Sequence, residues 1–125
     1  MRIQIQTDEI TMEAELSENE TGQKIFESLP IEGQVNRWGE EIYFSIPVDL
    51  SEASDARQEM EVGELGYWPP GTAFCIFFGP TPASHDQTPR AASNVNPFGM
   101  IKGDATVFTS VRNGETITLS ALEER

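Results

Sequence analysis

Few residues of this sequence could do acid–base or covalent chemistry. The single histidine, His85, precedes Asp86, and such a pair can act as a general base. No nucleophile motif accompanies the pair, so we interpret it as part of an exposed loop. The only cysteine, Cys75, stands in an apolar run without a basic neighbour, which favours a buried, inert thiol. We therefore predict no catalytic residue, no metal site and no cofactor.

Residues suited to binding are more prominent, because aromatic side chains and one arginine stand near the ends of predicted strands. Arg37 could hold a carboxylate or phosphate through paired hydrogen bonds, or it could form an ion pair with one of the many acidic residues. The aromatic residues could line the mouth of a barrel or belong to its core. Thr81 directly follows an apolar strand, where a loop often borders a cleft. The predicted ligand-binding residues are Arg37, Trp38, Tyr43, Trp68, Phe78 and Thr81.

Strands must position these residues, because alternation of polar and apolar side chains dominates the sequence. The alternation over 2–7 and 10–16 predicts a β-hairpin at the start of the chain. The run 73–78 is apolar on both faces, which predicts the most buried strand. Asn113-Gly114 has the signature of a type I′ turn and predicts a closing hairpin of strands 105–111 and 116–122. The remaining predicted strands are 31–35, 41–46 and 62–68.

One short helix and two long connections complete the expected organisation. Thr21 can cap a helix that Pro30 stops, and the apolar face of this helix suits the open end of a barrel. Residues 49–61 read as an acidic, solvated connection without metal-ligand spacing. Residues 79–99 read as a long Pro-rich loop.

The predicted elements define a fold class. About eight strands and no sustained βαβ alternation predict a mainly β protein with an antiparallel sheet, closed into an eight-stranded barrel. A chain of 125 residues, 38% of them hydrophobic, fits one domain over 1–125.

The charge of the chain excludes some partners. Eight basic residues stand against 21 acidic ones, which gives a net charge of −13. Nucleic acids and anionic membranes need a concentrated basic face, so neither is expected as a partner. No apolar stretch is long enough to cross a bilayer and the first residues alternate in polarity, so we expect a cytoplasmic protein.

Two motifs resemble a known family. The run Gly66–Pro82, which contains Gly66-Tyr67-Trp68-Pro69-Pro70-Gly71, and the preceding run Arg37–Phe44 resemble a family of small, uncharacterised bacterial and archaeal proteins with a cyclophilin-like fold. The resemblance covers nearly the whole chain. It implies a closed eight-stranded barrel related to that of the cyclophilin prolyl isomerases.

The same resemblance argues against isomerase chemistry. Cyclophilin isomerases hold the prolyl carbonyl with an arginine on the strand after a Phe-His pair, whereas residues 41–46 contain no basic residue. Their active-site Trp and His also have no counterpart, because Ser93–Pro97 stands in that place. Rotation about an X-Pro bond has a barrier of roughly 18–20 kcal/mol, and lowering it requires such a cation.

We therefore predict a binding protein for a small anionic ligand or an extended peptide. Its pocket is expected between the Arg37-Trp38 turn, the Trp68-Pro69 turn and the loop after Phe78. A weak prolyl isomerase that uses Arg37 or Arg90 is the alternative. An interaction module that pairs through an exposed barrel edge or the aromatic mouth, as a homodimer, is a third possibility.

Overall fold

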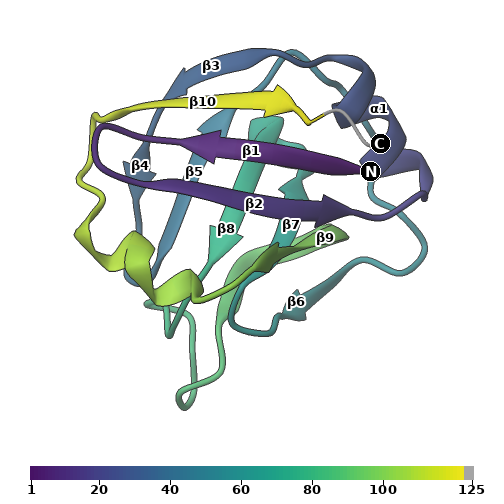
Figure 1. Cartoon of the computed structure of the whole chain (residues 1–125). Coiled ribbons are helices and arrows are strands. Elements are labelled where there is room, and N and C mark those ends of the chain that lie inside the picture. Colours follow the sequence, from purple (N-terminus) through teal and green to yellow (C-terminus); the bar gives the residue numbers. More distant parts are fainter. Residues whose placement is uncertain (123–125) are drawn as a thin grey trace.

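This computed structural model describes residues 1–122 of the chain. Within them lie ten strands, one α-helix and two 3₁₀ helices (Figure 1). In chain order the elements are β1 (Arg2–Gln6), β2 (Thr11–Leu16), α1 (Glu20–Glu27), β3 (Ile31–Gln34), β4 (Asn36–Arg37), β5 (Glu41–Ser45), β6 (Arg57–Glu59), β7 (Glu64–Trp68), η1 (Pro69–Gly71), β8 (Ala73–Phe77), β9 (Arg90–Lys102), η2 (Ala105–Ser110) and β10 (Thr116–Ala121).

The predicted N-terminal hairpin is confirmed. β1 and β2 pair antiparallel with Ile5 opposite Met12, and the turn between them is closed by the Thr7 N–H, which donates to the Ile10 carbonyl at 2.8 Å. The Thr7 hydroxyl accepts a second hydrogen bond, from the Ile10 N–H at 3.2 Å. Period-two alternation therefore sets the register, since every inward residue of one strand meets an inward residue of the other.

The strands form one rolled antiparallel sheet, in the order β3-β10-β1-β2-β9-β7-β8-β5-β4, with β6 paired to β9 (Figure 1). Among the described residues, this path of hydrogen bonds ends at β3 on one side and at β4 on the other, so the predicted closed eight-stranded barrel is not confirmed. β3 nevertheless packs against β5, the strand beside β4: a Cβ placed on Gly33 of β3 would lie 2.9 Å from the Phe44 ring of β5.

β8 is buried on both faces, as the apolar run predicts. Its residues Phe74 and Ile76 face the main core inside the rolled sheet, where Phe74 stacks on Phe44 with ring centroids 5.2 Å apart. The alternate residues face outward into a second apolar group that β9 covers. We call this group the outer cluster; it consists of Met60, Ala73, Cys75, Phe77, Ala91 and Val95.

The predicted helix exists, but its cap is different. Asn19 caps α1 by accepting a hydrogen bond from the Gly22 N–H at 2.8 Å. Thr21, the predicted cap, lies inside the helix and is buried, where its hydroxyl accepts a hydrogen bond from the buried amide of Asn96. Ile25 joins the main core. No helix within residues 1–122 is both long and apolar enough to cross a membrane.

The region 79–99 is only partly a loop, which corrects the prediction. β9 begins at Arg90 and is the longest strand of the described chain, although it contains Pro97. The register between β7 and β9 shifts where Leu65 pairs with Gly99 and Gly66 pairs with Pro97. Such an irregularity tolerates a proline, because the ladder hydrogen bond that a proline cannot donate is already interrupted there.

The predicted strand 105–111 is wrong. Its residues form η2, a 3₁₀ helix capped by Asp104, whose side chain accepts hydrogen bonds from the Thr106 N–H and hydroxyl. Asn113-Gly114 does form a turn, with a positive φ of 93° at Gly114, but this turn follows η2 and leads into β10. β10 then pairs with β1 and β3.

The connection 49–61, which was predicted to be solvated and acidic, contains one short strand, β6.

Candidate functional site

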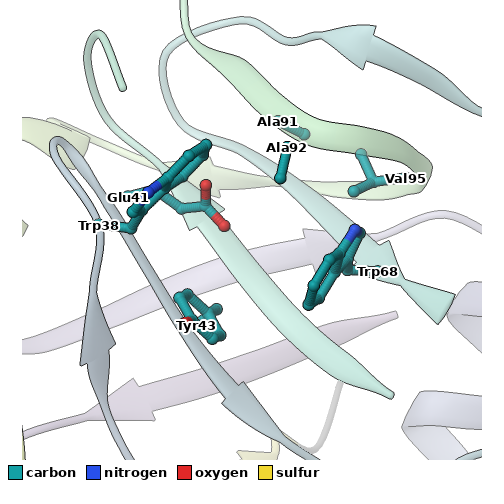
Figure 2. A pocket seen from close by; sticks show the side chains of 7 residues that line it. All are labelled: Trp38, Glu41, Tyr43, Trp68, Ala91, Ala92 and Val95. Atoms are coloured by element: carbon teal, nitrogen blue, oxygen red, sulfur yellow. The ribbon is translucent and has the colours of Figure 1, made fainter. Parts of the chain in front are cut away.

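A pocket of about 220 Å³ lies against the outer cluster, on the face of the sheet opposite the main core. We call it the outer pocket. Strand alternation explains its composition, since Ile42 and Phe44 of β5 enter the main core and Glu41 and Tyr43 face the other way. β9 supplies the facing wall (Figure 2). The lining residues are Trp38, Glu41, Tyr43, Trp68, Ala91, Ala92 and Val95.

A tight turn between β4 and β5 places two of these residues together. Trp38 and Glu41 exchange both backbone hydrogen bonds, at 2.9 and 3.2 Å, across the intervening Gly39 and Glu40. Gly39 has a φ of +60°, and a Cβ at this position would lie 2.8 Å from Pro82 and 2.9 Å from Thr81. A residue with a side chain would fit neither the conformation nor the space. The loop after β8 therefore fixes the turn that carries Trp38 and Glu41.

The opposite side of the pocket is an aromatic wall. Trp68 ends β7, and its indole Nε1 donates a hydrogen bond to the Ser93 hydroxyl of β9 at 2.7 Å. Gly71 lies against the indole ring, where a Cβ would come within 2.8 Å of it. Tyr43 meets the same indole edge to face, with ring centroids 6.4 Å apart. These contacts fix the Trp68 ring in one position before any ligand enters.

Glu41 is the polar group at the base of the pocket. It is only 5% exposed, and its Oε1 has no hydrogen-bond partner within the described chain. Burial raises the pKa of this carboxyl to about 8, an effect that the neighbouring Cys75 thiol partly offsets. Figure 2 shows the carboxyl group pointing into the space between the two indole rings. Near pH 7 the side chain is therefore mostly protonated and can donate or accept a hydrogen bond.

Cys75 lies beneath Glu41 in the outer cluster and is buried. Burial raises the pKa of the Cys75 thiol well above its ordinary value, and the adjacent Glu41 carboxyl raises it further. Such a thiol is a poor nucleophile, because the thiolate is the reactive form. The environment of the residue agrees with the inert role predicted for it.

Three of the six predicted ligand-binding residues meet in the outer pocket: Trp38, Tyr43 and Trp68. Two others lie elsewhere. Phe78 is buried in the main core, with its ring centroid 6.2 Å from that of Phe108. Thr81 is buried in the loop, where its hydroxyl donates to the Arg90 carbonyl and accepts from the Ala83 N–H.

Arg37, the sixth predicted residue, uses its guanidinium group in hydrogen bonds and an ion pair within the protein. Its guanidinium donates to the carbonyl oxygens of Gly39 at 2.6 Å and of Thr109 and Val111 at 2.8 Å each. It also pairs with the Glu40 carboxylate at 3.0 Å and lies 5.1 Å from the centroid of the Phe78 ring. These partners tie the β4–β5 turn to the end of η2 and the residue that follows it.

Sequence reasoning missed Glu41 and the β9 wall. Glu41 shares a face with Tyr43 by strand alternation, and that signal could have placed it beside the predicted aromatic residues. The β9 wall was not predicted because residues 90–97 read as a loop.

His85 lies in the exposed part of the 79–89 loop. The neighbouring Asp86 carboxylate accepts a hydrogen bond from the Thr88 N–H, and this bond lowers the pKa of Asp86.

Comparisons with known proteins add a family and a structural relative. A family model described as Cyclophilin-like matches residues 1–120. The solution structure of the hypothetical protein AF2241 from Archaeoglobus fulgidus is 38% identical in sequence and superposes with a TM-score of 0.81, covering 96% of this chain and 93% of its own. A search of curated proteins finds no match.

Proposed function

Because the chain belongs to the cyclophilin-like family, we propose that it is a binding protein that has lost isomerase chemistry and takes a small ligand into the outer pocket. The ligand has an apolar body and one polar group that contacts Glu41. The observation that carries this proposal is the buried Glu41 carboxyl group, which points into a preformed space with aromatic walls and whose Oε1 has no partner within the described chain (Figure 2). A buried polar group without a partner costs about 1–3 kcal/mol, which a ligand can recover.

The composition of the pocket favours a neutral or cationic polar group over the anion expected from the sequence. That expectation depended on Arg37, whose donors are bound to carbonyl oxygens and to Glu40. No lining residue is basic. An extended peptide remains compatible with the proposal if one of its side chains enters the pocket, since about 220 Å³ is below the range of pockets for drug-sized molecules.

A fragment titration followed by ¹⁵N NMR tests the binding proposal. The chain has two tryptophans, both of which line the pocket, so their indole N–H resonances report on it directly. We expect apolar fragments with one polar group to shift both resonances. Ala92→Phe should abolish these shifts, because Ala92 is an exposed lining residue and the larger ring would fill the entrance.

A control variant makes the result specific. Val62→Phe adds the same ring at a position that is 49% exposed and outside the pocket, so it should leave the shifts unchanged. If no fragment shifts either indole, the proposal fails. If Val62→Phe abolishes the shifts, or Ala92→Phe leaves them intact, the pocket has been placed wrongly.

We expect no prolyl isomerase activity above background in a chymotrypsin-coupled assay with an Xaa-Pro peptide. β5 carries no basic residue, and the guanidinium groups of Arg37 and Arg90 are paired with Glu40 and with Gln58. Without an oriented cation the barrier of roughly 18–20 kcal/mol stays in place. A cyclophilin isomerase run in parallel is the positive control. A rate that Arg37→Ala or Arg90→Ala removes would instead support the weak-isomerase alternative.

A further inference from the structure

We infer that the outer pocket is a site for a primary alkylammonium group, with the ammonium on the Glu41 carboxylate and the alkyl chain between the rings of Trp38, Tyr43 and Trp68. This inference rests on the proposed function and specifies the class of ligand. Three observations carry it: the acceptor without a partner, the aromatic walls and the charge of the protein.

The first observation is the acceptor. The carboxyl group of Glu41 points into the pocket (Figure 2), and its buried Oε1 has no partner among the described residues. An ammonium group has three N–H donors and no acceptor, so it can satisfy a carboxylate oxygen directly. A hydrogen bond between two charged groups is about twice as strong as one between neutral groups. A quaternary ammonium lacks an N–H and would leave Oε1 without a partner.

The walls favour a cation as well. Three aromatic side chains surround the carboxyl group, and a cation within about 6 Å of a ring face is attracted by the electrons of the ring. The Ser93 hydroxyl binds the Nε1 of Trp68, and Tyr43 packs edge to face against the same indole, so the Trp68 ring is held in place as one wall. Ala91 and Val95 complete the lining with apolar surface for a short alkyl chain.

The charge of the molecule acts in the same direction. The net charge of −13 raises the local concentration of small cations and repels anions. No basic residue lines the pocket, so an incoming ammonium would meet no repulsion from a neighbouring cation there. These effects favour an ammonium over a neutral carbonyl group, the other partner that a protonated Glu41 could bind.

Binding of an ammonium should release a proton, which gives the inference a distinctive pH dependence. The pKa of Glu41 is about 8, so the carboxyl is mostly protonated near pH 7 and must ionise to form the ion pair. The charged or titratable neighbour that affects it is the Cys75 thiol of β8; Tyr43 of its own strand also lines the pocket, and β9 contributes only Ala91, Ala92 and Val95. Affinity for an ammonium should therefore rise by about tenfold between pH 7 and pH 9.

The test compares n-butylammonium with 1-butanol, its neutral counterpart, in NMR titrations at about pH 7 and pH 9 that follow the two indole resonances. We expect n-butylammonium to bind at least about tenfold more tightly than 1-butanol at pH 9, with an affinity that falls by about tenfold at pH 7. The affinity of 1-butanol should not rise with pH. n-Butyltrimethylammonium, which has the same alkyl chain, should bind more weakly than n-butylammonium because it has no hydrogen-bond donor.

Two variants separate the possible outcomes. Glu41→Gln keeps the shape and removes the charge, so it should abolish both the preference for the ammonium and the pH dependence. Trp38→Leu should weaken n-butylammonium more than 1-butanol. If 1-butanol and other neutral fragments bind as tightly as the ammonium, the inference is overturned while the proposed function stands. If neither class shifts the indoles, both fail.

Discussion

Glu41→Gln should raise the free energy of unfolding at about pH 9 by several kcal/mol and leave it nearly unchanged at about pH 4. The cause is the buried carboxyl, whose pKa is about 8 in the folded protein against an ordinary value of 4.5. The folded state thus holds its proton more tightly than the unfolded state does. Ionisation therefore destabilises the native protein progressively as the pH rises from about 4.5 to about 8.

The size of the effect follows from the same two values. Since a tenfold change in an equilibrium constant corresponds to about 1.4 kcal/mol, complete ionisation of Glu41 costs up to about 5 kcal/mol. Glutamine has the same shape and never ionises, so the variant avoids this cost. Below about pH 4.5 the wild-type carboxyl is neutral in both states and the two proteins should be equally stable.

Urea unfolding across this pH range measures the difference. Glu32→Gln is the matched control, because Glu32 is also on a strand, β3, but is exposed, and the substitution should change stability little at any pH. A Glu41→Gln protein that is less stable than wild type at pH 9 would contradict the burial of an unpaired carboxyl. An n-butylammonium ligand should narrow the gap at pH 9, because it pairs with the ionised wild-type carboxylate.

Phe74→Ala should lower the free energy of unfolding by about 3–5 kcal/mol. Phe74 is fully buried on the inner face of β8, where its ring centroid lies 5.2 Å from that of Phe44 and 5.1 Å from that of Phe98. The variant loses the transfer energy of the ring and leaves a cavity between two other rings, which the surrounding strands cannot fill.

The midpoint of urea unfolding at a fixed pH measures this loss. Val62→Ala is the control, because Val62 is 49% exposed and its truncation should cost no more than about 0.5 kcal/mol. A loss below about 1 kcal/mol for Phe74→Ala would mean that β8 is not the centre of the core.

Local patterns were enough to predict three elements: alternation predicted the β1–β2 hairpin and β5, and a continuous apolar run predicted the double burial of β8. These elements are regular, and their core-facing residues meet apolar partners, such as Ile5 opposite Met12 and Phe44 opposite Phe74. The same reasoning wrongly predicted a strand over residues 105–111. The Asp104 side chain caps the turn that follows it, and a 3₁₀ helix forms there in place of a strand. One polar side chain there outweighs a weak apolar alternation.

β9 could not be predicted because the strand forms through pairing with β7, which is distant in sequence, and not through a local pattern. Pro97 and the polar residues around it are typical of a loop, and they fit a strand only because the register against β7 shifts beside Gly66. A Cβ at Gly66 would lie 2.7 Å from Val95, so the glycine lets β9 approach the sheet closely. The pocket wall depends on this long-range pairing, which the sequence does not reveal.

The site was predictable in its aromatic part alone. Trp38, Tyr43 and Trp68 lie in the two motifs that resemble the family, and Trp68 was also a candidate for an aromatic wall. Arg37 was listed for a ligand because it stands at a strand end within one of these motifs. The alternative, an ion pair with an acidic residue, is what the structure contains with Glu40, and the other partners of Arg37, the Thr109 and Val111 carbonyls, lie more than seventy residues away in sequence. Glu41 was overlooked because burial of a single carboxyl depends on what covers it.

The two halves of β9 pack against different apolar groups. Its second half contributes Phe98 to the main core, whereas its first half lies with β6 over the outer cluster alone. Local opening of the first half and of β6 would expose only the smaller apolar group, so we expect their amide hydrogens to exchange faster than those of the rolled sheet. A ligand bound in the outer pocket should slow this exchange.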